Sequence, residues 1–136
     1  MDVSKIIDYA RQEARIMVLY LVGSYDTPYQ TPLSDVDFAI ISKHRLKFDD
    51  QVEILGRFTG MLRTDNVDII FLPGAGVRVQ HKVISQGRLL YCRDETFLAD
   101  FVERTIKLYG DFEPFLTRFY RDYDARLREE YKHDRA

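Results

Sequence analysis

The chain has 136 residues, of which 46% are hydrophobic and 31% are charged, and this composition is typical of one globular domain. The 20 Lys and Arg residues against 22 Asp and Glu residues give a net charge of -2, which argues against a general nucleic-acid binder. A single cysteine, Cys92, excludes an intramolecular disulfide and a thiolate zinc cluster. Because we also find no targeting segment and no apolar run of membrane-spanning length, we expect a cytoplasmic protein that binds neither a membrane nor nucleic acid directly.

The first third of the chain predicts a helix, a buried strand and a loop. Apolar residues recur at helical spacing before Arg15, which predicts an amphipathic helix. The continuously apolar run 16–22, closed by Gly23, predicts a central strand that is covered on both faces. Residues 24–33 contain two prolines and several polar residues, which favours a loop with a short helical turn after Ser24.

The second predicted strand, residues 35–41, has an acidic beginning. Period-two geometry places Asp35 and Asp37 on one face, while Val36 and Phe38 lie on the other. The pattern that follows predicts four more elements: a helix over 48–62, a strand over 67–72, a helix over 77–86 with Gly87 as its C-cap, and a short strand over 88–92. This alternation predicts a mixed α/β (α+β) core.

The C-terminal segment changes character. From residue 94 onward the apolar spacing is helical, and it predicts two helices that are separated by a break at Gly110 and Asp111, with Pro114 in the first turn of the second helix. We therefore expect residues 1–93 to form the core and residues 94–136 a C-terminal helical extension packed on it, within a single domain overall.

The aromatic side chains of this segment have two interpretations. The chain has nine Tyr and nine Phe residues, and half of them follow residue 96. In one interpretation they pack helix against helix and helix against sheet. In the other they anchor a partner chain, and both can hold at once.

Three carboxylates, Asp35, Asp37 and Asp68, stand in apolar strands, where acidic residues are unfavourable unless something pairs with them. Asp35 and Asp37 are two residues apart on one strand, so their alpha carbons are about 6.6 to 6.8 Å apart and both side chains can reach one metal ion. If the two strands are neighbours, the three charges repel each other without a cation. Mg2+ prefers carboxylates together with substrate phosphates, and two such ions activate a hydroxyl and stabilise leaving pyrophosphate. The cluster therefore predicts nucleotidyl transfer.

The second half of the predicted site is the dipeptide Gly23-Ser24 at the end of the first strand. A glycine lets the backbone approach a phosphate closely, and a following serine can donate both its N-H and its hydroxyl to that phosphate. The dipeptide alone carries little information. Combined with the spacing to Asp35, Asp37 and Asp68, it is much more specific.

These residues resemble the motifs of the polymerase-beta-type nucleotidyltransferases, and among them the minimal, MNT-type proteins. The resemblance covers residues 1–92 and depends on three strings: Gly23-Ser24, Ser34-Asp35-Val36-Asp37 and Val67-Asp68-Ile69-Ile70. It implies a mixed sheet flanked by helices, with Asp35 and Asp37 as metal ligands. It further implies that Asp68 completes the metal site and helps to deprotonate the acceptor hydroxyl, and that Gly23 and Ser24 hold the triphosphate of ATP.

The resemblance also implies a function and a partner. Stand-alone MNT proteins are antitoxins encoded beside HEPN ribonuclease toxins, and some of them transfer AMP from ATP to a toxin tyrosine. By this similarity we expect a magnesium-dependent protein adenylyltransferase that forms a hetero-oligomer with its cognate HEPN toxin. AMPylation would add negative charge and bulk beside the ribonuclease site, by the same physical logic as phosphorylation.

Two alternatives to this function stay open. The chain departs from many relatives because no Lys or Arg occurs between Ser24 and Lys43, so cations for the triphosphate would come from Mg2+ and from Lys43, Arg57 or Arg78. This departure motivates an antitoxin that acts by stable complex formation with little catalysis. The same site also fits a nucleotidyltransferase for a small molecule of the aminoglycoside type.

Overall fold

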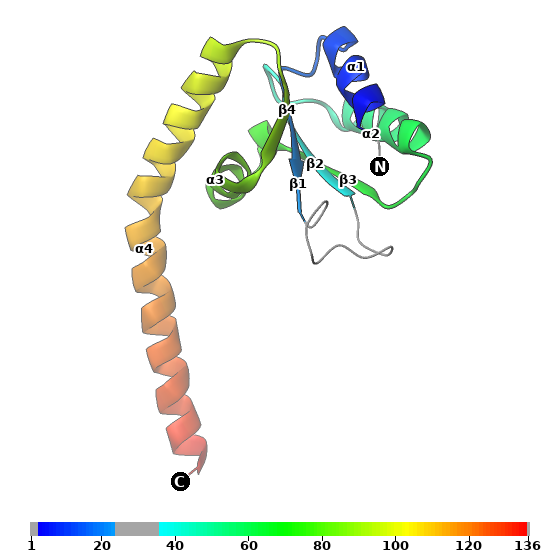
Figure 1. Ribbon diagram of the computed structural model, residues 1–136. Helices are drawn as coiled ribbons and strands as arrows, with labels where there is room; N and C mark the ends of the chain where they lie inside the picture. The colour runs from blue at the N-terminus through cyan, green and yellow to red at the C-terminus, as the bar shows by residue number, and fades with distance from the viewer. Residues whose placement is uncertain (1–2, 24–35, 136) are drawn as a thin grey trace.

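A four-stranded sheet with helices on both faces forms the body of the protein (Figure 1). The computed structural model describes residues 3–23 and 36–135. In chain order the elements are α1 (Ser4–Gln12), β1 (Val18–Val22), β2 (Val36–Ile41), α2 (Phe48–Leu62), β3 (Val67–Phe71), the 3-10 turn η1 (Leu72–Gly74), α3 (Val77–Gln86), β4 (Arg88–Cys92) and α4 (Glu95–Arg135). The predicted mixed fold is confirmed, and the helices over 48–62 and 77–86 and the strand over 88–92 have the predicted bounds.

The sheet is mixed in direction, with the strand order β3-β2-β1-β4. Strand β1 is antiparallel to both of its neighbours, β2 and β4, whereas β2 and β3 are parallel. The C-terminal end of β1 therefore lies at the same edge of the sheet as the N-terminal ends of β2 and β3. We call this the catalytic edge and define it by Gly23, Asp37 and Asp68, which are the described residues of the site that the sequence predicts.

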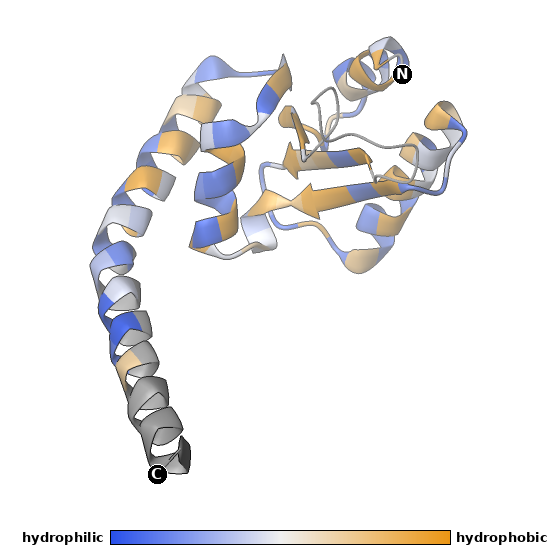
Figure 2. Ribbon diagram, turned by 60° about the horizontal axis from the view of Figure 1, so that its bottom comes forward, coloured by the Kyte–Doolittle hydropathy of each residue, from blue (hydrophilic) through white to orange (hydrophobic). Residues whose placement is uncertain are grey.

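Alternation along the strands divides the core into two halves. Leu19, Phe38 and Ile40 point to the face covered by α1 and α2, where the rings of Phe38 and Phe58 meet edge to face at 5.1 Å. Val18 and Ala39 point to the other face, which α3 and the start of α4 cover. The central strands are hydrophobic along most of their length (Figure 2), as expected of strands that are buried on both faces.

Helix α4 differs from the prediction. It is one helix that continues through Gly110 and Pro114, so the predicted break between two helices is wrong. Proline removes one backbone donor and crowds the carbonyl four residues earlier, which here belongs to Gly110. The residues on both sides of Pro114 include many strong helix formers, and the loss of one hydrogen bond does not end such a helix.

The first turns of α4 pack against α3, where Phe101 and Thr105 are buried. Beyond this contact the helix extends away from the sheet (Figure 1). The predicted boundary between residues 93 and 94 stays a prediction. None of the described helices combines the length and apolar composition needed to cross a membrane.

The Arg93 guanidinium caps the end of α1. Its Nη2 donates to the carbonyl oxygens of Ala10 at 2.9 Å and Glu13 at 3.0 Å, and its Nε donates to Ile16 O at 3.2 Å. Carbonyls at a helix C-terminus have few intrahelical donors. Arg93 adds a charged donor to the carbonyls of Ala10 and Glu13, which also accept backbone N-H groups, and so fixes the end of α1 and the turn after it. We expect Arg93→Ala to lower the free energy of unfolding by about 2 kcal/mol, as measured by urea denaturation.

The matched control for this prediction is Arg11→Ala. Arg11 forms an exposed pair with Asp8, and such surface pairs contribute roughly 0 to 1 kcal/mol. Equal losses of stability in the two variants would contradict the capping role of Arg93.

A network around Arg15 joins the turn after α1 to α2 and makes the free energy of unfolding depend on pH. Arg15 donates to Glu13 Oε1 at 2.8 Å and to Asp50 Oδ1 at 3.1 Å. The hydrogen bond to Arg15 lowers the pKa of Glu13 from 4.5 to about 2. Because the folded pKa is the lower one, this stabilisation is complete above pH 4.5 and is lost as the pH falls through 2.

The Arg15→Gln variant tests this dependence. After allowance for solvent screening, we expect it to remove about 1 to 2 kcal/mol at neutral pH. We also expect the difference in unfolding free energy between the variant and the wild-type protein to shrink between pH 4.5 and 2. Urea denaturation across that range measures this difference. A difference that does not change with pH would contradict the assignment.

Candidate active site

The predicted site residues meet at the catalytic edge because of the strand register. Val22, the last residue of β1, pairs with Asp37 of β2, and Asp37 pairs with Asp68 of β3. The sequence analysis required β2 and β3 to be neighbours, and this is confirmed. Two carboxylates that are 31 positions apart in the chain thus occupy directly opposite positions on parallel strands.

Asp37 and Asp68 share a face of the sheet. Each is followed two positions later by a residue that packs in the core beneath α3, namely Ala39 and Ile70, and side chains two apart on a strand point to the same side. Asp37 is half-buried and Asp68 is exposed. An oxygen of Asp68 accepts the backbone N-H of Ile69 at 2.9 Å, which restrains its carboxylate near the start of β3.

Gly23 lies directly against the Asp37 carboxylate. Its φ of +86° is in the left-handed region, and a Cβ added to it would lie 2.8 Å from Oδ2 of Asp37. Both the backbone conformation and the available space therefore require glycine here. Gly23 and Asp37, which the sequence placed in separate motifs, form one contact.

Two residues of the predicted site, Ser24 and Asp35, lie outside the described residues, so their roles stay predictions. Within the described ranges, 3–23 and 36–135, no group of three metal-ligating side chains is found. The pair formed by Asp37 and Asp68 nevertheless fits a hard cation, because both are carboxylates on one face of adjacent strands. Magnesium commonly binds to one or two protein carboxylates and completes its coordination with phosphate and water.

The cations considered for the triphosphate lie elsewhere. Lys43 follows the end of β2 that is opposite the catalytic edge. Arg57 belongs to α2, which covers the other face of the sheet. Arg78 is on the face of the carboxylates, but it lies in the first turn of α3 and lines a groove between α3 and α4. The structure therefore places Lys43 and Arg57 away from Asp37 and Asp68, and it places Arg78 in the lining of the groove.

The sequence analysis missed that groove. Arg78 and Lys82 of α3 line one side of the groove. Their spacing of four residues on a predicted helix places both on the same side of that helix, and this is the one local signal in the sequence. Its other wall belongs to α4. The packing of two helices creates the groove, and the local pattern of either helix does not reveal it.

Comparison with known proteins supports a common origin for the sheet and its edge. Residues 4–96 match the family described as "Polymerase beta, Nucleotidyltransferase". A curated relative, "Protein adenylyltransferase MntA" of Shewanella oneidensis, is 29% identical over 110 residues, which cover 78% of this chain and 76% of the relative.

Solved structures have the same fold. A chain of a toxin-antitoxin crystal structure with AMP-PNP aligns with a TM-score of 0.77 and 25% identity, and the match covers 90% of this chain and 98% of that one. A chain from a structure of a tri-AMPylated Shewanella oneidensis HEPN toxin in complex with MNT antitoxin aligns with a TM-score of 0.70 and 25% identity. This match covers 87% of this chain and 92% of the other.

Proposed function

Since the chain belongs to the polymerase beta nucleotidyltransferase family, we propose that it transfers AMP from ATP to a side-chain hydroxyl of a HEPN-type ribonuclease toxin and so acts as its antitoxin. The observation that carries the proposal is the catalytic edge, where Asp37 pairs with Asp68 and Gly23 lies against the Asp37 carboxylate. Tyrosine is the acceptor we expect.

The comparisons support the choice of nucleotide and partner. A curated relative is a protein adenylyltransferase, a similar solved structure contains an ATP analogue, and the toxin in another is tri-AMPylated. We therefore expect ATP as substrate, a hetero-oligomer with the toxin, and one or more AMP groups on each toxin molecule. A cytoplasmic location stays a prediction, which the lone cysteine supports.

The proposed reaction is a displacement at the α-phosphorus of ATP. The acceptor hydroxyl oxygen forms the new bond to that phosphorus while the bond to the pyrophosphate oxygen breaks, and pyrophosphate leaves. The Asp68 carboxylate takes up the hydroxyl proton, which its exposed position at the start of β3 permits. Gly23 leaves room for the Asp37 carboxylate beside the end of β1. In this proposal the backbone of Gly23 and the N-H and hydroxyl of Ser24 hold the triphosphate.

A divalent cation belongs to this proposal. Two Mg2+ ions would be held by the carboxylates of Asp35, Asp37 and Asp68. When bound, magnesium stabilises the charge on the phosphates and on the leaving pyrophosphate. Without it, the paired Asp37 and Asp68 would repel both each other and the substrate.

Release of pyrophosphate tests this function. The wild-type protein with ATP and Mg2+ should release pyrophosphate when the HEPN-type toxin is present and should release almost none without it. Chelation of Mg2+ should stop the reaction. Release that depends on an aminoglycoside instead of the toxin would favour the small-molecule alternative.

A second candidate, neutralisation by complex formation, is favoured by the shape of α4. This helix continues well beyond its contact with α3 (Figure 1), and its sequence there is rich in aromatic residues, which are frequent anchors of interfaces. The two candidates differ in one outcome. A catalytically inactive variant that still protects cells from the toxin would support complex formation.

A further inference from the structure

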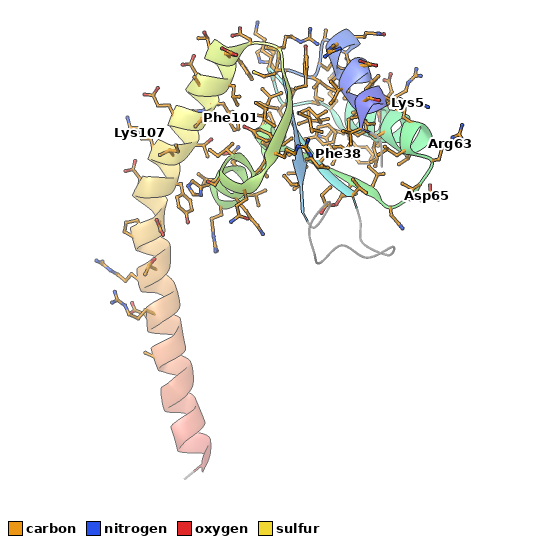
Figure 3. All side chains as sticks on the ribbon, in the orientation of Figure 1. Lys5, Phe38, Arg63, Asp65, Phe101 and Lys107 are labelled. Carbon is orange, nitrogen blue, oxygen red and sulfur yellow. The ribbon has the colours of Figure 1, made fainter. Side chains whose placement is uncertain are left out.

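The turn between α2 and β3, residues 63–66, leads directly into the catalytic edge. Helix α2 ends at Leu62, and the next residue, Arg63 (labelled in Figure 3), is left-handed with a φ of 55°. Among the described residues it is the one non-glycine residue with a positive φ. This conformation is unfavourable for a residue with a Cβ, so other contacts have to fix the path of the turn.

Two hydrogen bonds at Asn66 supply such contacts. The Asn66 N-H donates to the hydroxyl oxygen of Thr64, which is half-buried, at 3.1 Å. The Asn66 carbonyl oxygen accepts the N-H of Val36, the first residue of β2, at 2.8 Å. The Thr64 hydroxyl therefore holds the residue that connects the turn to β2.

This connection lies beside the catalytic carboxylates. Val36 of β2 pairs with Val67 of β3, and the next pair along the two strands is Asp37 with Asp68. The hydrogen bond between Val36 and Asn66 thus precedes the carboxylate pair by one residue on β2. A shift of residue 66 would move the start of β3, and with it Asp68, relative to Asp37.

We propose that Thr64 is a positioning residue for the transfer of AMP, whose hydroxyl keeps the carboxylates of Asp37 and Asp68 at their working separation. This inference rests on the proposed function. Two carboxylates that share cations and substrate phosphates need a defined spacing, and a misplacement of about 1 Å can lower a rate by about 10²-fold. Thr64 acts through the backbone of Asn66, and the reacting groups stay intact without its hydroxyl. The loss should therefore be smaller and should fall on kcat.

The test compares the kinetics of three variants with those of the wild-type protein. Thr64→Val removes the hydroxyl at nearly constant size, and Thr64→Ser keeps it. The control is Thr59→Val, because the Thr59 hydroxyl donates to Gly56 O at 3.0 Å in a bond that stays within α2. We expect Thr64→Val to lower kcat about tenfold and to keep the KM for ATP within about twofold. The serine variant and the control should stay within about twofold of wild type in both parameters.

Hydrogen exchange of the Val36 amide gives a second readout that does not depend on activity. We expect this amide to exchange at least about fivefold faster in Thr64→Val than in wild type, because its acceptor on Asn66 is less firmly held. The Met17 amide, which donates to Ile41 O at 2.9 Å at the other end of β2, should keep its wild-type rate. The pair of amides separates a local effect at the catalytic edge from a general loss of stability.

Each other outcome overturns the inference. A wild-type kcat in Thr64→Val, or a Thr64→Ser variant that is equally slow, would refute the positioning role and leave the proposed function intact. Faster exchange at both amides would assign the loss of activity to general destabilisation and would also refute it. A wild-type protein that transfers no AMP to the toxin would refute the proposed function and the positioning role together.

Discussion

The Asp37→Asn variant is expected to fold normally and to lose about 10³-fold or more in the rate of AMP transfer. The substitution preserves the shape of the side chain but removes the charge at the centre of the catalytic edge, between Gly23 and Asp68. A carboxylate that holds a catalytic cation contributes to transition-state charge stabilisation, and a loss of about 4 kcal/mol corresponds to this factor. Transfer of radiolabelled AMP from ATP to the toxin measures the rate.

The control for this prediction is Asp65→Asn. Asp65 is an exposed carboxylate in the turn before β3 (Figure 3), so its charge lies near the same strand without belonging to the Asp37 and Asp68 pair. We expect it to retain activity within about twofold, because an exposed charge away from the reacting groups has little effect. Full activity in Asp37→Asn would refute the proposed site, whereas inactivity in both variants would point to a general electrostatic effect.

The Gly23→Ala variant should lose about 10²-fold of its activity, although the change adds one methyl group. That methyl would lie 2.8 Å from Oδ2 of Asp37, and the backbone at φ +86° disfavours any residue with a Cβ. The carboxylate or the end of β1 must therefore move, and a small displacement of a catalytic group has a large kinetic effect. We also expect a loss of about 1 kcal/mol or more in stability from the backbone strain.

Alanine at Gly56 or Gly60 is the matched control. Both glycines lie within α2, and a Cβ at either one would meet nothing within 4 Å. These substitutions should raise stability by roughly 0.5 to 1 kcal/mol and leave the rate of transfer unchanged. If Gly23→Ala behaved like them in both assays, the contact between Gly23 and Asp37 would have no role in catalysis.

Local patterns were sufficient to predict most of the body of the fold. The helix over 48–62 and the strand over 88–92 have the predicted bounds, because amphipathic spacing and flanking glycines are local signals. The alternation predicted for residues 35–41 placed Val36 and Phe38 on the face opposite to Asp37, and the structure confirms this for the described part of the strand. The pairing of Asp37 with Asp68 was expected only on the condition that their strands are adjacent, and the register confirms it.

The differences arise where tertiary structure or context outweighs a local signal. Gly110 and Pro114 are both helix breakers by propensity, yet α4 passes through them, because a single missing hydrogen bond is a small fraction of such a long helix. The groove beside Tyr109 depends on the packing of α3 against α4, which neither helix encodes alone. Ser24 and Asp35 lie outside the described residues, so their part of the site stays a prediction.

Intact mass spectrometry of the HEPN-type toxin, after incubation with this protein, ATP and Mg2+, tests the central claim most directly. We predict that the toxin gains the mass of one or more AMP groups with the wild-type protein and gains none with the Asp37→Asn variant. An unchanged toxin mass, with a stable complex between the two chains, would contradict AMP transfer. It would assign neutralisation to binding alone.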